Sequence, residues 1–161
     1  MELRLEPLTL KDADEVFALT SNPEVARYMR FDTQRSREEA EELIRGYTEK
    51  GSFGYRIMSD DRKEMMGVAA LKSGDKEGEY SISIFMAPQY WNQGYSTRVV
   101  GKLIETAREK NIQCLSAYIV EENTGSRKIM EKWGFEVEQI LHFEDMTSGL
   151  YVYRLLLENI S

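Results

Sequence analysis

The residues best suited to chemistry lie in a polar loop from Pro88 to Thr97, with the sequence PQYWNQGYST. An alternating apolar run before it indicates a strand over residues 79–86, and an apolar 3.6-residue period after it predicts a helix from Gly94 to Lys110. A helix N-terminus presents unpaired N–H groups and the positive end of the helix dipole, and the small Gly94 and Ser96 let a phosphate approach the backbone. The loop therefore predicts an anion cradle, with an ordinary strand-to-helix turn as the alternative. It has neither a Walker Lys-Ser/Thr pair nor repeated glycines of the dinucleotide type, so we exclude both of those motifs.

Length and composition narrow the function classes. With 161 residues, 42% of them hydrophobic, the chain is expected to form one domain over residues 1–161 with a substantial core. No apolar run reaches the length of a membrane span and the first residues lack a signal-peptide core, so we expect a cytoplasmic protein that binds no membrane. One cysteine and one histidine make no zinc set, so no metal is predicted. The net charge of -7 disfavours nucleic-acid binding and mildly favours a cationic partner.

The rest of the chain supplies strands and helices around the loop. Apolar periods and turn residues predict strands at residues 3–7, 53–58, 64–71, 79–86, 114–120, 135–144 and 150–157. Helix starts are predicted at Thr9 with Asp12, at Asn22-Pro23, at Ser36 with Glu39 as a capping box, and at Asn123. Asn111 and Gly134 are expected to end the two later helices. This order indicates an α/β or α+β layer structure around one mixed sheet, with an antiparallel meander and a right-handed parallel crossover.

Five segments also occur in the order and spacing of a known family. They are Leu3–Pro7, Asn22–Met29, Ala87–Thr97, Asn123–Ser126 and Glu131–Phe135. Together they make the chain resemble the GNAT superfamily of acetyl-CoA-dependent N-acyltransferases, and within it the RimJ/RimL-like branch that includes ribosomal-protein N-terminal acetyltransferases. The resemblance covers nearly the whole chain. It implies a single domain with a seven-stranded, mostly antiparallel mixed sheet, flanked by helices and splayed between the fourth and fifth strands.

The resemblance also implies how acetyl-CoA is held. The coenzyme A pyrophosphate would bind backbone N–H groups of the loop and the helix start, at Asn92, Gln93, Gly94, Tyr95, Ser96 and Thr97. The strand end, Phe85, Met86 and Ala87, would pair with the pantetheine arm as another strand would, and one of its N–H groups would polarise the thioester carbonyl. Asn123 would hydrogen-bond the pantetheine, and Ser126 would donate a proton to the leaving thiolate. Without the resemblance, Asn123 is simply a helix N-cap and Ser126 a first-turn residue.

Two departures from the branch concern the cradle and the general base. The branch usually has Gly at position 92 and Ala or Gly at position 96, but Asn92 can adopt a positive φ and Ser96 adds only one oxygen. Many relatives carry a Glu where this chain has Ser81, and the carboxylate here is Glu79. Both residues share a strand face about 7 Å apart, so Glu79 could act through water. The alternative is that Glu79 is a solvated residue at the strand start.

Other reactive residues receive minor roles. His142, expected on the sixth strand, is a possible base but more readily a surface residue. Cys114 begins a core strand without an adjacent base, so we expect a buried side chain and no covalent enzyme intermediate. Tyr151 and Tyr153, on the last strand, could line the acceptor cleft.

The sequence therefore predicts an acetyl-CoA-dependent N-acetyltransferase in which a primary amine attacks directly in a ternary complex. A weak base favours a protein N-terminal α-amine, since its unperturbed pKa is about 7.7–8.0 whereas a lysine-type amine titrates near 10.4. Alternatives are acetylation of a polyamine or an amine antibiotic, and a catalytically silent acyl-CoA-binding module. The acidic residues near Glu38–Glu42 and Glu121-Glu122 would suit a polycation. A monomer and a homodimer both remain open.

Overall fold

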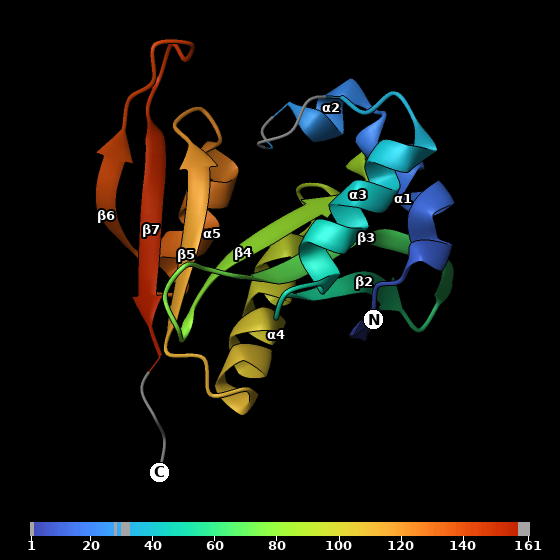
Figure 1. The fold of residues 1–161 in the computed structure, drawn as a ribbon, viewed down its shortest axis with the longest axis horizontal. Coiled ribbons are helices and arrows are strands. Elements are labelled where there is room, and N and C mark those ends of the chain that lie inside the picture. Colours follow the sequence, from blue (N-terminus) through green and yellow to red (C-terminus); the bar gives the residue numbers. More distant parts are fainter. Residues whose placement is uncertain (1, 28, 30–32, 158–161) are drawn as a thin grey trace.

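Seven strands form one mixed sheet at the centre of the molecule (Figure 1). The computed structural model describes residues 2–27, 29 and 33–157, so Tyr28 of the Asn22–Met29 segment lies outside the described residues. The strand order is β1-β2-β3-β4-β5-β7-β6, in which β4 and β5 are parallel and the other neighbours antiparallel. This arrangement confirms the predicted sheet. In chain order the elements are β1 (Leu3–Pro7), the 3-10 helix η1 (Leu10–Asp12), α1 (Ala13–Thr20), α2 (Pro23–Ala26), α3 (Arg37–Thr48), β2 (Phe53–Ser59), β3 (Arg62–Ser73), β4 (Glu79–Met86), the 3-10 helix η2 (Pro88–Tyr90), α4 (Tyr95–Glu109), β5 (Cys114–Val120), α5 (Thr124–Lys132), β6 (Glu136–Leu141) and β7 (Leu150–Leu156).

Most element boundaries lie within two residues of the predicted ones. The clearest difference is at β6, which ends at Leu141 rather than at residue 144. The chain turns there, with the N–H of Met146 donating to the carbonyl of Phe143 at 3.1 Å. The expectation that His142 lies on a strand is therefore wrong, because this residue lies in the connection between β6 and β7.

Side-chain caps explain where the early helices begin. Thr9 and Asp12 form the predicted capping box, and the side-chain oxygen of Asn22 accepts from the N–H of Glu24 at 2.9 Å. Only half of the predicted Ser36 box forms. Ser36 Oγ accepts from the N–H of Glu39 at 3.3 Å, but the Glu39 carboxylate accepts from the preceding residue, Arg35, rather than from Ser36.

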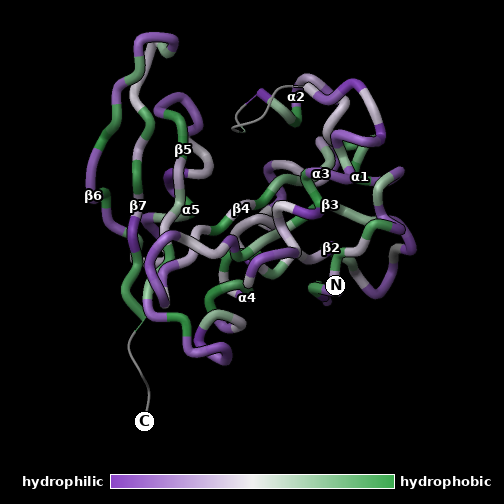
Figure 2. Tube along the Cα trace, in the orientation of Figure 1, coloured by the Kyte–Doolittle hydropathy of each residue, from purple (hydrophilic) through white to green (hydrophobic). Residues whose placement is uncertain are grey.

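Helices cover both faces of the sheet. α1 and α3 pack on one face of β2 and β3, and α4 packs on the opposite face. The buried side of α4 consists of Val99, Val100, Leu103, Ile104 and Ala107. α5 contacts α4 and β5, and joins it on the same face. Figure 2 shows hydrophobic residues along the strands and hydrophilic residues in several of the connecting turns.

The parallel pair β4 and β5 separates along its length, as predicted. Pairing is limited to three positions, from Glu79 opposite Cys114 to Ser81 opposite Ser116. Beyond Ser81 the two strands diverge, which Figure 1 shows as the widening gap between β4 and β5. The sheet therefore opens at the carboxyl half of β4.

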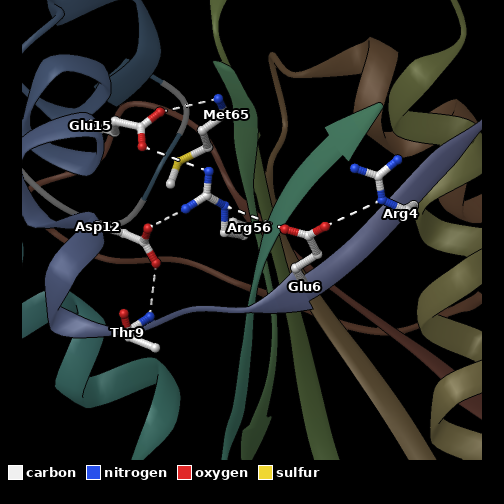
Figure 3. Close-up of polar contacts among 7 residues, drawn as sticks. All are labelled: Arg4, Glu6, Thr9, Asp12, Glu15, Arg56 and Met65. Atoms are coloured by element: carbon white, nitrogen blue, oxygen red, sulfur yellow. Dashed lines mark hydrogen bonds and ion pairs between the residues drawn. The ribbon is translucent and has the colours of Figure 1, made fainter. Parts of the chain in front are cut away.

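An ionic cluster around the buried Asp12 fastens η1 and α1 to the sheet (Figure 3). Arg56 of β2 donates to the Asp12 carboxylate at 2.5 Å, and its guanidinium lies 3.8 Å from both Glu6 and Glu15. Asp12 also accepts from the N–H of Thr9 at 2.9 Å, and Glu15 accepts from the N–H of Met65 at 3.1 Å. Because the Asp12 side chain is only 5% exposed, its charge depends on these donors.

The described residues contain neither a membrane-spanning helix nor a cluster of potential metal ligands. No helix there is long and apolar enough to cross a membrane. Nor does any group of three or more His, Cys, Asp or Glu side chains in the same part of the chain have the arrangement of a metal site.

Candidate active site

A cavity of about 460 Å³ lies where β4 and β5 diverge. Its walls include residues from both faces of the sheet, so it passes between the two strands. On the side of α4 and α5 the lining includes Ser96, Val100, Asn123, Ser126, Ile129 and Met130. On the side of α3 it includes Leu43, Tyr47, Lys72, Ser81, Ser83 and Tyr118. A group entering from one face can therefore meet a group entering from the other.

The predicted cradle lies at the first of these two sides. Gly94 has φ of 82° and Asn92 has φ of 60°, as the sequence allowed, and the chain enters α4 at Tyr95. The N-cap Gly94 makes no side-chain cap, and no acidic residue lies in the first turn. The first-turn N–H groups of Tyr95, Ser96 and Thr97 have no partner within the helix. This geometry fits a phosphate, and Ser96 connects the cradle to the cavity because it also lines the cavity.

Two indoles hold the ends of this loop in place. Trp91 donates from Nε1 to the carbonyl of Met86 at 2.8 Å, and Trp133 donates from Nε1 to the carbonyl of Thr97 at 2.9 Å. The Trp133 ring lies against Gly101 of α4, where an added Cβ would approach it to 2.7 Å. Both indoles are therefore held by backbone contacts, although each side chain stays partly exposed at the surface.

The N–H groups at the end of β4 point alternately toward β3 and toward the opening between β4 and β5. The N–H of Ala87 donates to the carbonyl of Met66 at 2.9 Å, on the β3 side. Backbone groups alternate between the two edges of a strand, so the Phe85 N–H also faces β3 while that of Met86 faces the opening. The close approach of β3 to β4 depends on Gly67, opposite Met86. A Cβ there would lie 2.3 Å from the Phe85 carbonyl oxygen.

Asn123 and Ser126 come to the cavity from the start of α5. Asn123 Oδ1 accepts from the N–H of Ser126 at 3.3 Å, so Asn123 is an N-cap. This cap uses the side-chain oxygen, which leaves the amide NH₂ to donate toward the cavity. Ser126 is half-buried and lines the cavity as well. The structure thus brings both residues to the cavity, and Asn123 is at the same time the helix N-cap that the sequence offered as the alternative.

Arg127 fixes the start of α5 against β7. Its guanidinium carbon lies 3.9 Å from the Tyr151 ring centroid, Nε donates to Tyr153 Oη at 3.1 Å, and Nη1 donates to the Glu121 carbonyl at 3.2 Å. The bond to Tyr153 raises the pKa of Arg127, while burial raises the pKa of Tyr153. Tyr151 and Tyr153, predicted as candidates for the acceptor cleft, are absent from the described lining of the cavity and instead hold α5.

Glu79 and Ser81 have different surroundings although they share a strand face. Ser81 lines the cavity, and Glu79 does not. The Glu79 carboxylate accepts from Arg154 Nη2 at 2.8 Å. Arg154 also donates to Glu138 at 3.1 Å and to Cys114 Sγ at 2.9 Å, and these bonds raise its pKa. Cys114 is buried, as expected.

The sequence did not single out the polar group on the α3 side. Tyr47, at the end of the buried face of α3, shares a 2.8 Å hydrogen bond with Ser83 Oγ. Lys72 Nζ lies 5.6 Å from the centroid of the Tyr47 ring. Burial raises the pKa of the Tyr47 phenol, so this hydroxyl is neutral at physiological pH. The available signal was the pair Ser81 and Ser83 on the polar side of an otherwise apolar strand.

Comparisons with known proteins agree with this geometry. A family model described as an acetyltransferase (GNAT) domain matches residues 2–136. The chain belongs to the GNAT acetyltransferase family. This GNAT protein is 28% identical over 145 residues to the uncharacterized N-acetyltransferase YoaA of Bacillus subtilis, which covers 86% of this chain and 82% of YoaA. It is 26% identical over 164 residues to the uncharacterized N-acetyltransferase p20 of Bacillus licheniformis, and this match covers 96% of this chain and 92% of p20.

Solved structures share the fold. The spermidine N-acetyltransferase of Vibrio cholerae, solved with CoA and spermine, superposes with a TM-score of 0.84 at 17% identity, over 96% of this chain and 95% of that chain. A putative phosphinothricin N-acetyltransferase superposes with a TM-score of 0.83 at 19% identity, over 98% of this chain and 99% of that chain. The family model and the two N-acetyltransferase relatives make this GNAT protein an acetyl-CoA-dependent N-acetyltransferase.

Proposed function

We propose that this GNAT protein acetylates a protein N-terminal α-amine by direct attack within a ternary complex, as a RimJ/RimL-like enzyme. The supporting observation is the cavity that passes between β4 and β5. It joins the α4 cradle and Ser126 on one face to Tyr47 and Ser81 on the other. The donor and the acceptor can thus enter from opposite faces and meet between the strands. A cytoplasmic location for this reaction stays a prediction.

The α4 face holds the donor in this proposal. Backbone N–H groups from Gln93 to Thr97, with the turn formed by Asn92, bind the pyrophosphate. The pantetheine arm lies along the open edge of β4, bonded by the outward N–H of Met86, with Phe85 and Ala87 holding that edge against β3. The amide NH₂ of Asn123 donates to the arm from the opposite wall.

The chemistry then needs few side chains. The Met86 N–H stabilises the negative charge that develops on the thioester oxygen. The amine nitrogen forms a bond to the acetyl carbon and the carbon–sulfur bond breaks. Ser126 Oγ–H supplies a proton to the departing sulfur and regains one from water. The amine loses one proton to water at the α3 side, where Ser81 and the Tyr47–Ser83 pair can accept hydrogen bonds. Glu79 takes no direct part in this scheme, because it is bonded to Arg154 and is absent from the described lining of the cavity.

The lining of the cavity favours an α-amine as the acceptor. Among the described lining residues there is no carboxylate, and the Tyr47 phenol is neutral. The site therefore offers no strong base, which suits an amine that is already partly neutral near pH 7.7–8.0. The described lining offers no negative charge to bind a polycation, because the glutamates of α3 lie outside it. One of these glutamates, Glu41, is also paired with Arg37 and Arg45.

An acceptor panel tests this proposal. Thiol release from acetyl-CoA is measured with peptides of different N-terminal residues, polyamines and aminoglycosides. Peptides should be acetylated, and Ser126→Ala should lower kcat about 100-fold without weakening coenzyme A binding. Ser21→Ala, at the end of α1, is the matched control and should leave both unchanged. Tight coenzyme binding without acetylation of any amine would instead support a binding-only role.

A further inference from the structure

Lys72 places a positive charge at the acceptor side of the cavity. It lies on β3 directly opposite Ser81 of β4, and its side chain lines the cavity. Nζ stands 5.6 Å from the centre of the Tyr47 ring, which is within the range of a cation–π contact. Since Tyr47 is buried and bonded to Ser83, the ring is a fixed support for the ammonium group.

No protein carboxylate neutralises this charge within the described part of the chain. Lys72 is the one charged side chain among the described lining residues, and it takes part in none of the ion pairs between described residues. Glu79, on the same face as Ser81, is already bonded to Arg154. The Lys72 ammonium is therefore positioned to meet the charge of a bound molecule.

We propose that Lys72 selects acceptors that carry an acidic side chain within the first three residues of their N-terminus. This inference rests on the proposed acetylation of N-terminal α-amines. The cavity is lined along β4 from Ser81 to Ile84, which is about 10 Å of extended chain. An extended peptide whose amine lies at Ile84 has its second or third residue beside Lys72. A carboxylate there gains an ion pair, whereas a basic side chain is repelled.

Matched peptides test the selection. Three peptides differ only in the second residue, which is glutamate, glutamine or lysine, and kcat/KM is measured for each with saturating acetyl-CoA. The wild type should prefer glutamate over glutamine about three- to fivefold, because an exposed ion pair contributes modestly. Lys72→Met keeps the aliphatic stem and should abolish this preference. Lys72→Glu should reverse it, so that the lysine peptide becomes the best of the three.

Lys76→Glu is the control for net charge. Lys76 lies in the turn between β3 and β4 and is absent from the described lining of the cavity, so its reversal should leave the peptide preference unchanged. Equal rates for the three peptides, or a preference that Lys72→Glu leaves intact, would overturn the selection by Lys72 while acetylation of N-termini stands. Failure of the wild type to acetylate any of the peptides would overturn both proposals.

Discussion

A single methyl group added at Gly67 should displace the end of β4, which we propose binds the pantetheine arm of acetyl-CoA. Gly67 lies on β3 opposite Met86. An alanine Cβ would come within 2.3 Å of the Phe85 carbonyl oxygen and 2.8 Å of Met86 Cα. Both are backbone atoms, so no side-chain rotation relieves the contact. β4 must move instead.

The size of that movement sets the expected effect. Ordinary contact begins near 3.4 Å, so the strand must shift by about 1 Å at the Phe85 oxygen and about 0.6 Å at Met86 Cα. Overpacking of this kind costs about 1–3 kcal/mol of folding free energy. A displacement of about 1 Å at a reacting centre can cost about 100-fold in rate. Gly67→Ala should therefore fold, with a lowered melting temperature, and lose far more activity than stability.

Calorimetric binding of coenzyme A and steady-state kinetics give the readout. Gly46→Ala is the matched control, because no atom lies within 4 Å of the added Cβ and an alanine suits the interior of α3. The control should keep both activity and binding. Wild-type turnover in folded Gly67→Ala would refute the idea that the outward N–H of Met86 must be accurately placed.

Three further outcomes follow from contacts elsewhere. Arg56→Gln removes the main charged partner of buried Asp12 and should lower the free energy of unfolding by about 3 kcal/mol. Urea titrations measure this change, and an unchanged free energy of unfolding would mean that the pair is solvated. Burial raises the pKa of Tyr47, so the unfolded chain releases the phenol proton near pH 10 while the folded chain keeps it. The free energy of unfolding should therefore fall as pH rises above about 10. Tyr47→Phe should weaken that fall, and an unchanged alkaline profile would contradict the assignment. Arg127→Met should raise KM for acetyl-CoA several-fold because α5 loses its bond to Tyr153, whereas an effect on melting temperature alone would mean a purely structural role.

Local signals were sufficient to predict much of the fold. Caps at Thr9 and Asn22, the positive φ of Asn111 after α4, and alternating strands depend on short-range chemistry that the sequence displays. The end of β6 was missed because the turn that closes on Phe143 depends on the pairing of β6 with β7. The second half of the Ser36 capping box was missed as well, because the Glu39 carboxylate accepts from the nearby N–H of Arg35 rather than from that of Ser36.

The candidate site was predictable on the donor side alone. The cradle and the pair Asn123 and Ser126 are contiguous segments with recognisable spacing. The acceptor side brings Tyr47, Lys72 and Ser83 together from three separate elements, and no sequence period reports that meeting. The pairing of Glu79 with Arg154, 75 residues later, is equally invisible before the sheet order is known.

The two bonded indoles give the protein built-in optical probes. Trp91 and Trp133 are its two tryptophans, and each donates to a backbone carbonyl at one end of the 86–97 segment. Fluorescence of single-tryptophan variants should therefore report separately on the strand side and the helix side of the loop. Because both ends are held before any ligand arrives, occupancy should change the intensity of emission more than its wavelength. The same anchoring should keep the entropy of ordering small when coenzyme A binds.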